Sequence, residues 1–196
     1  MNVCLVVDSN LKTVNIGVRT QRIKPYIRTN GQIYCTYVID NKSPSWPRMD
    51  EIRERRYTEI IIALGINHCK VGEDNQGRAI LELIEIYRRY LREIPGIRIY
   101  HVMVPPSLSI RINGNIDRFN KTMALMLQSI PQIVIVTMPP VLYAESGLLC
   151  ENYARSNEKL PGFPDRKKLH LNAEGVIKIV YRIIRAISIT TGKRIR

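Results

Sequence analysis

Three polar side chains stand beside apolar runs, at places where a parallel sheet would gather them. Ser9 follows the run at 3–7, Asn67 follows the run at 59–64, and His170 precedes an amphipathic stretch. A hydroxyl, an amide and an imidazole can serve acyl transfer as nucleophile, oxyanion donor and general base. Taken singly, each has a commoner structural role, since serine caps helices and asparagine forms turns. Their order along the chain, each beside a predicted strand or helix, makes a shared site worth considering.

The elements that must position this set alternate between strands and helices. Strands are predicted at 3–7, 33–39, 59–64, 97–104 and 133–138. Several of these runs are apolar throughout, which is typical of strands covered on both faces. Helices are predicted at 48–56, 76–96, 114–131 and 172–189. In the last helix we expect the core to take up Ile177, Val180, Tyr181 and Ile184.

This alternation predicts βαβ units and therefore an α/β fold. We expect one domain over 1–196, a three-layer sandwich whose mainly parallel sheet has about five strands and helices on both faces. The longest irregular stretch, 138–169, is expected to be a structured loop. Ligands of such sheets bind beyond the carboxyl ends of the strands. That edge would gather "DSN", "DNKSPSW", "GINHC" and the loop that enters the last helix.

The motifs at that edge resemble the SGNH (GDSL-type) hydrolase superfamily. Its pattern has G-D-S after the first strand, a glycine after the second, G-x-N after the third, and D-x-x-H before the last helix. This chain has "VDSN" with Ser9, "GIN" with Gly65 and Asn67, and "KKLHLN" with His170. The resemblance implies a five-stranded parallel sheet between helices, with Ser9, Asn67 and His170 in the hydrolytic pocket.

The chain departs from that pattern where the chemistry is most demanding. Val7 replaces the first glycine, "IDNKSPSW" has no glycine, and Lys167 stands where the triad aspartate should be. Neutralising that aspartate lowers turnover about 10⁴-fold in a serine protease, and a cation opposes the imidazolium directly. Asp8 and Asp165 are the nearest substitutes, but Asp165 is two residues out of register. We therefore expect a vestigial pocket without catalytic residues.

The net charge of +13 predicts a polyanionic partner, because so much unbalanced charge on a folded domain repels itself. Arginine-rich clusters on loops suit phosphate contacts and base stacking. The predicted RNA-binding residues are Arg22, Lys24, Arg28, Lys42, Arg48, Arg166, Lys167 and Lys168. A further stripe on the last helix, Lys178, Arg182 and Arg185, can be interpreted as an ordinary solvated face.

A basic SGNH-like domain with a degenerate triad resembles the OSK domains of insect germ-plasm proteins. That resemblance implies binding of single-stranded RNA, in particular mRNA 3′-untranslated regions, together with mRNA localisation and protein partners in cytoplasmic germ granules. Two alternatives stay open. One is an active serine esterase or acetyl-hydrolase that uses Ser9 and His170. The other is a scaffold for acidic proteins, whose binding would survive RNase treatment.

Other classes of site find little support in the sequence. The histidines, His68, His101 and His170, lack metal-ligand spacing, so neither a metal nor another cofactor is predicted. The cysteines, Cys4, Cys35, Cys69 and Cys150, form no C-x-x-C pair and are expected to be reduced thiols. No apolar run approaches the roughly 20 residues that span a bilayer. The start, "MNVCLVVDSN", lacks signal-peptide features and is expected to form a buried strand.

Overall fold

Five short apolar strands form one parallel sheet. The computed structural model describes residues 3–8, 33–38, 46–69, 73–155 and 170–192. The strands are β1 (Val3–Val7), β2 (Ile33–Val38), β3 (Glu59–Ala63), β4 (Arg98–Val102) and β5 (Ile133–Val136). They lie in the order β2-β1-β3-β4-β5, and every pairing is parallel. The predicted five-stranded α/β sheet is confirmed.

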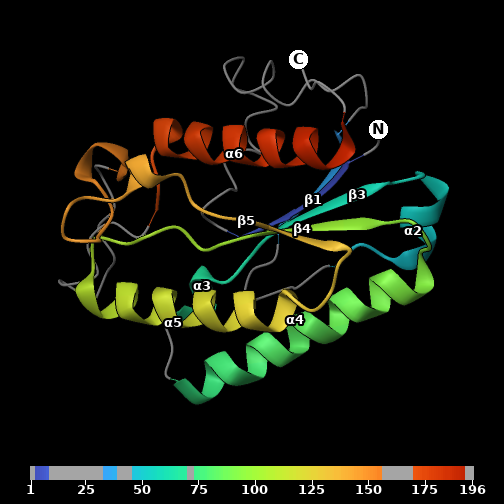
Figure 1. Cartoon of the computed structure of the whole chain (residues 1–196), viewed down its shortest axis with the longest axis horizontal. Coiled ribbons are helices and arrows are strands. Elements are labelled where there is room, and N and C mark those ends of the chain that lie inside the picture. The colour runs from blue at the N-terminus through green and yellow to red at the C-terminus, as the bar shows by residue number, and fades with distance from the viewer. Residues whose placement is uncertain (1–2, 9–32, 39–45, 70–72, 156–169, 193–196) are drawn as a thin grey trace.

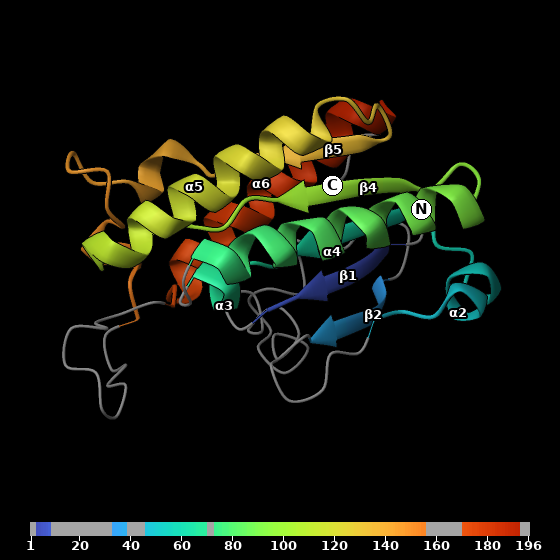
Figure 2. The same cartoon turned by 90° about the horizontal axis from the view of Figure 1, so that it is seen from below.

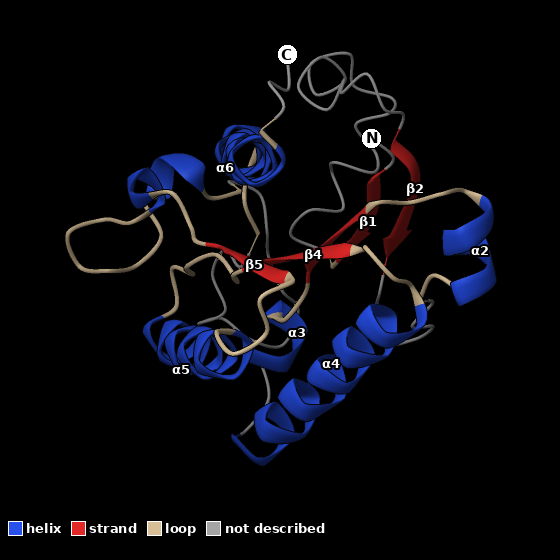
Figure 3. Cartoon of the chain, turned by 45° about the vertical axis from the view of Figure 1, so that its right-hand side comes forward, coloured by secondary structure: helices blue, strands red, loops and turns tan. Residues whose placement is uncertain are grey.

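Helices cover both faces of the sheet, so the three-layer prediction is also confirmed. On one face lies α6 (Ala173–Thr191), and on the other lie α3 (Ile66–Cys69), α4 (Glu73–Glu93) and α5 (Ile110–Leu127) (Figures 1 and 2). The short helix α2 (Met49–Glu54) lies to one side of this sandwich, beside the end of the sheet where the strands begin (Figures 2 and 3).

The sheet divides the core into two layers, which explains why the strand sequences are apolar throughout. Alternate side chains of a strand point to opposite faces. Ile60 and Ile62 pack with residues of α4 and α5, whereas Ile61 and Tyr100 pack with residues of α6. Full burial of an isoleucine side chain contributes about 1.5–3 kcal/mol. Both faces of the central strands are therefore needed to stabilise the fold.

The helices differ from the predictions mainly at their ends. Helix α5 begins at Ile110, four residues before the predicted start, because the Ser109 hydroxyl accepts a hydrogen bond from the Ile112 N–H at 3.5 Å. An N-cap of this kind satisfies one of the N–H groups that a helix start leaves without a partner. Helix α4 is shifted three residues towards the N-terminus of its predicted range.

The buried face of α6 corrects a prediction. Tyr181 was expected in the core, but its side chain is 48% exposed, and Ile177 and Ile184 are only partly buried. The helix instead buries Gly175, Val176, Ile179, Val180, Ile183 and Ile187. A Cβ at Gly175 would lie 3.1 Å from the carbonyl oxygen of Tyr153. This close approach sets the rotation of the helix, and the apolar spacing alone does not reveal it.

The irregular stretch between β5 and α6 is ordered by short local structure. Up to residue 155 it contains the 3₁₀ turns η1 (Pro140–Leu142) and η2 (Glu151–Tyr153). Tyr143 pairs with Leu149 in an isolated antiparallel bridge, and Ala154 pairs with Leu171 in another. The structured-loop prediction is confirmed for this part, whereas 156–169 lies outside the described residues.

Candidate functional site

The candidate site lies at the carboxyl edge of the sheet, where the strand order reverses between β1 and β3. In open parallel sheets such a reversal leaves a crevice for ligands. Asp8 follows β1, and Gly65 and Asn67 follow β3. His170 precedes α6, whose Ile179 lines a pocket together with Asp8 and Leu64. The structure thus places Asn67 within α3, just after β3, and His170 just before α6.

Asp8 joins the end of β1 to the start of α3. Its side chain is 5% exposed, and its Oδ2 accepts a hydrogen bond from the Ile66 N–H at 3.1 Å. Its own N–H donates to the carbonyl oxygen of Ala63 at 3.0 Å. A carboxylate this deeply buried is tolerated only when hydrogen bonds replace its hydration. Asp8 therefore acts as a clamp on the turn that carries Asn67, a role that the sequence analysis missed.

Gly65 is the residue that this turn requires. Its φ of +136° lies in a region that side chains with a Cβ rarely adopt. A Cβ there would lie 2.6 Å from Val104 Cγ2 and 2.7 Å from Phe119 Cε1. The Gly65 carbonyl oxygen accepts the N–H groups of His68 and Cys69, both at 3.0 Å, and so begins α3. The short helix α3, which was not predicted, results from this geometry.

His170 is positioned through its backbone. Its carbonyl oxygen accepts the Arg155 N–H at 2.9 Å, next to the bridge between Ala154 and Leu171. Asn172 then caps α6, since its Oδ1 accepts the Gly175 N–H at 2.9 Å. The Asn172 side chain also donates from Nδ2 to the Asn152 carbonyl oxygen at 2.6 Å. The helix-cap interpretation of Asn172 is confirmed.

The pocket between the sheet and α6 is small and mainly apolar. Its walls come from Asp8, Ala63, Leu64, Val102, Met103, Val104, Pro105 and Ile179, and it is partly open to solvent, with only about 10 Å³ of space that a water-sized sphere can occupy. Asp8 supplies the only charged side chain of this lining. A space of this size holds about one water molecule, and the described residues that line it supply no cation for a phosphate.

Most of the predicted RNA-binding residues lie outside the described residues. These are Arg22, Lys24, Arg28, Lys42, Arg166, Lys167 and Lys168, and Ser9 of the pocket is outside them as well. Arg48 is described and is exposed. It precedes α2, which lies beside the end of the sheet where the strands begin, whereas α3, which contains Asn67, follows the carboxyl end of β3 (Figure 2). The structure therefore does not bring Arg48 together with the pocket.

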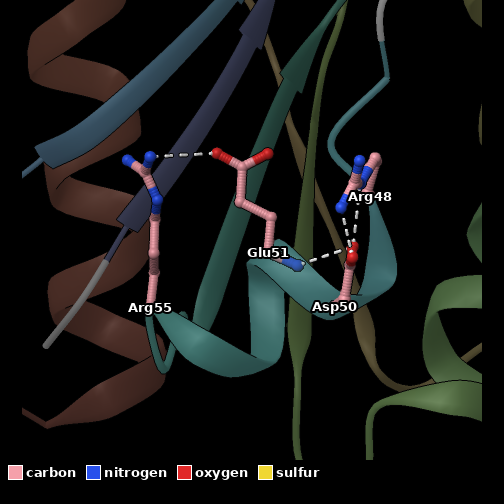
Figure 4. Close-up of polar contacts among 4 residues, drawn as sticks. All are labelled: Arg48, Asp50, Glu51 and Arg55. Carbon is pink, nitrogen blue, oxygen red and sulfur yellow. Dashed lines mark hydrogen bonds and ion pairs between the residues drawn. The ribbon is translucent and has the colours of Figure 1, made fainter.

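The charge of Arg48 is also compensated locally. Its guanidinium forms an ion pair with Asp50, and Arg55 pairs with Glu51 at 3.2 Å on the same helix (Figure 4). The hydrogen bond from Arg48 lowers the pKa of the Asp50 carboxyl, so the carboxylate stays ionised beside its partner. Exposed pairs of this kind contribute little to stability. They do, however, reduce the positive field around α2.

The charge of the whole chain is distributed unevenly. The described residues contain 16 basic and 14 acidic side chains, whereas the other segments contain 14 basic and only 3 acidic ones. The described framework is thus nearly neutral. The large segments outside it, 9–32 and 156–169, are joined to described residues of the candidate site, Asp8 and His170. Almost all of the net positive charge of the chain therefore lies in the segments outside the described residues.

Other polar groups serve the core. His101 on β4 is fully buried, and its Nδ1 is hydrogen-bonded to the Tyr87 hydroxyl at 2.9 Å. Burial lowers the pKa of His101 to about 4, so the imidazole is neutral at physiological pH. Cys4 and Cys69 are buried thiols, as predicted. Within the described ranges, no three histidine, cysteine, aspartate or glutamate side chains gather as metal ligands do.

No family model matches the chain, and no curated protein matches it. Solved structures do match. A GDSL-like lipase from Bacteroides thetaiotaomicron aligns with a TM-score of 0.68 at 15% identity, over 96% of this chain and 88% of that one. The chain has the SGNH hydrolase fold. The fold also appears in a carbohydrate esterase family 3 protein from Talaromyces cellulolyticus, with a TM-score of 0.57, 15% identity, and coverage of 98% and 99%.

The SGNH fold is shared as well with the C-terminal catalytic domain of a peptidoglycan O-acetyltransferase from Streptococcus pneumoniae. That alignment has a TM-score of 0.57 at 12% identity and covers 100% of this chain and 97% of that one. At such identities the likeness establishes the fold and leaves the activity open. Among the described residues, no helix has the length and apolar character needed to cross a membrane.

Proposed function

We propose that this chain is a non-catalytic SGNH-like domain that binds single-stranded RNA at the carboxyl edge of its sheet. The partners we propose are mRNA 3′-untranslated regions, with a role in mRNA localisation and germ granule assembly, as in the OSK domain of Oskar. Cytoplasmic granules would be its location, and granule proteins its further partners.

The uneven distribution of charge carries this proposal. The segment at 9–32 contains five basic residues and no acidic one, and 156–169 contains "DRKK" shortly before His170. The segment 9–32 follows Asp8, which lines the pocket, and 156–169 precedes His170, whereas the described framework itself is nearly neutral. RNA phosphates are the polyanion that dense arginine and lysine clusters bind most generally. The loss of hydrolysis follows from Lys167, since an ammonium group there opposes the imidazolium that His170 would form.

The test is the salt dependence of RNA affinity. Fluorescence anisotropy of a labelled single-stranded RNA gives the association constant at several salt concentrations. Each phosphate contact to a single strand contributes about 0.7 to the slope of log K against log salt. The variant Arg166→Gln/Lys167→Gln/Lys168→Gln should therefore lose about 2 units of slope and bind about 100-fold more weakly at about 0.1 M salt.

A matched control removes the same total charge from another face. The triple variant Arg111→Gln/Arg118→Gln/Lys121→Gln lies on α5, and we call it the α5 control. It should keep a slope close to that of the wild type. Equal losses in both variants, or an affinity that salt does not change, would contradict an RNA site at the pocket edge. Binding that persists unchanged after RNase treatment would favour the protein scaffold.

A second candidate is an active esterase, because the solved structures that share this fold include a lipase and a carbohydrate esterase. It would use Ser9 as the nucleophile, Asn67 as an oxyanion donor and His170 as the base. Hydrolysis of 4-nitrophenyl acetate by the wild type and by Ser9→Ala separates the two functions. Turnover that disappears in Ser9→Ala would establish the esterase, whereas equal background rates support the non-catalytic domain.

A further inference from the structure

The outer face of α6 carries three cations at helical spacing. Lys178, Arg182 and Arg185 follow one another at intervals of four and three residues, so they lie on one face of the helix. Arg185 is exposed, and Lys178 and Arg182 are partly exposed. No other described α-helix covers this side of α6 (Figures 1 and 3). We refer to these three residues as the α6 stripe.

Within the described framework, the α6 stripe lacks the acidic partners that neutralise other basic residues. On α4, Arg78 pairs with Glu82 at 3.1 Å and Arg89 pairs with Glu93 at 3.0 Å. The ion pairs between described residues lie on α2, on α4 and between β3 and β4, and none of them includes a residue of α6. Of the nearby acids, Glu174 lies four residues before Lys178, whereas Arg182 and Arg185 have no acid three or four residues away on α6.

A comparison with α5 shows that charge alone does not distinguish the α6 stripe. The exposed residues of α5 also include three cations, Arg111, Arg118 and Lys121. There, Asp117 lies four residues before Lys121, and on α6 Glu174 lies four residues before Lys178 in the same way. The cations of the two helices thus have similar acidic neighbours, and the α6 stripe differs in the exposed ring of Tyr181, since the aromatic residue of α5, Phe119, is buried.

An aromatic ring lies within the α6 stripe. Tyr181 is three residues from Lys178 and four from Arg185, so it shares their face, and its side chain is 48% exposed. Arg182 beside it is held in place, because its Nη2 donates to the Thr137 hydroxyl at 2.8 Å and its Nε to the Thr137 carbonyl oxygen at 3.4 Å. Alternating cations and an exposed aromatic ring match the needs of a nucleic-acid single strand, namely phosphate contacts and base stacking.

The alternative polyanions fit this face less well. A helix that binds a membrane surface needs a broad apolar face to insert. The apolar face of α6 is already buried in the core, through Val176, Ile179, Val180, Ile183 and Ile187. Ile189, which is 73% exposed, is the largest apolar contribution that α6 makes to the outside. An acidic protein could pair with the cations of the α6 stripe, but its carboxylates would not require the exposed ring of Tyr181.

We propose that the α6 stripe together with Tyr181 is a second contact surface for single-stranded RNA, next to the pocket edge. The inference rests on the proposed function and extends it to residues of the described framework. Helix α6 starts at the cap that follows His170, so the stripe continues from the edge along the outside of the molecule. It extends about 10 Å along the helix, which is enough for two or three phosphates.

The test compares Lys178→Gln/Arg182→Gln/Arg185→Gln with the α5 control, which also removes two arginines and one lysine. Anisotropy with labelled oligouridine should show a loss of about 2 units of salt slope and about 100-fold in affinity at about 0.1 M salt for the α6 variant. The α5 control should stay near the wild type. Thermal unfolding of both variants verifies that these exposed changes leave the fold intact.

A second pair of variants tests stacking independently of charge. Tyr181→Ala should weaken oligouridine binding by about tenfold with an unchanged salt slope, because stacking on an aromatic ring contributes without neutralising a phosphate. Tyr181→Phe keeps the ring and should bind as the wild type does. Equal binding by the Ala and Phe variants would overturn the stacking contact.

The outcomes separate this inference from the proposed function. If the wild type binds RNA and the Arg166/Lys167/Lys168 variant is weakened while the α6 variant matches the α5 control, only the second surface is refuted. If the wild type does not bind RNA, both proposals fail. If the α6 variant keeps its RNA affinity but loses binding to phosphatidylcholine vesicles that contain phosphatidylserine, the stripe is a membrane contact and the inference is overturned.

Discussion

Replacing Gly65 with alanine perturbs the turn that carries Asn67 in two separable ways. The first is backbone strain, since a φ of +136° costs a residue with a Cβ about 1–3 kcal/mol. The second is overpacking, because the new Cβ would lie within 2.7 Å of both Val104 and Phe119. Crowding a packed core costs about 1–3 kcal/mol. Together we expect Gly65→Ala to lower the free energy of unfolding by about 2–6 kcal/mol.

Equilibrium urea denaturation measures this loss, and Gly114→Ala provides the matched control. Gly114 lies within α5 and is exposed, and a methyl group added there would meet no neighbouring side chain or strand within 4 Å. Alanine is the better helix former by about 0.8–1.0 kcal/mol, so this variant should be slightly stabilised. For a chain of this size, a loss of about 3 kcal/mol lowers Tm by about 6–12 °C. A Gly65→Ala protein within about 0.5 kcal/mol of the wild type would refute the reasoning.

Three further predictions concern the core and the start of α6. Burial in the folded state lowers the pKa of His101 from 6.5 to about 4. The unfolded state therefore binds a proton at this residue first, so the contribution of neutral His101 to the free energy of unfolding is complete above about pH 6.5 and is lost as the pH falls towards 4. Between pH 7 and pH 4 the wild type should therefore lose about 3 kcal/mol more unfolding free energy than His101→Gln; parallel pH profiles from urea titrations would disprove this. Tyr87→Phe removes the partner of the buried imidazole and should cost about 1–3 kcal/mol in the same assay, and a neutral result would mean that the hydrogen bond at 2.9 Å is unimportant. Asn172→Ala removes the α6 cap and should cost about 1 kcal/mol, with Asn172→Asp retaining most of the stability as the control.

The sequence predicted the sheet because its strands are short, apolar and regularly separated by helical periods. It also indicated that Asp8 and Gly65 lie at the same edge of the sheet, since parallel strands all end on the same side. The predictions failed where a single long-range contact determines the orientation of a helix or a turn. The close approach of Gly175 to Tyr153 sets which face of α6 is buried, and that contact joins residues 22 positions apart.

The clamp by Asp8 illustrates the same limit. Its neighbour in the sequence is Ser9, but its hydrogen-bond donor is Ile66, 58 residues further along the chain. An acidic residue after a strand signals a turn or a cap, and nothing local indicates that the carboxylate reaches across to the next loop. The ion pair between Arg48 and Asp50 was not predicted for a related reason. A count of basic residues does not show which of their charges a nearby acidic side chain compensates.

The most direct test of an RNA-binding surface on this fold is ultraviolet crosslinking of the intact chain to single-stranded RNA, followed by peptide mapping. We expect crosslinked peptides from 9–32, from 156–169 and from the part of α6 that contains Tyr181. Crosslinks confined to α4 and α5, or none at all above the level of a neutral control protein, would contradict this expectation.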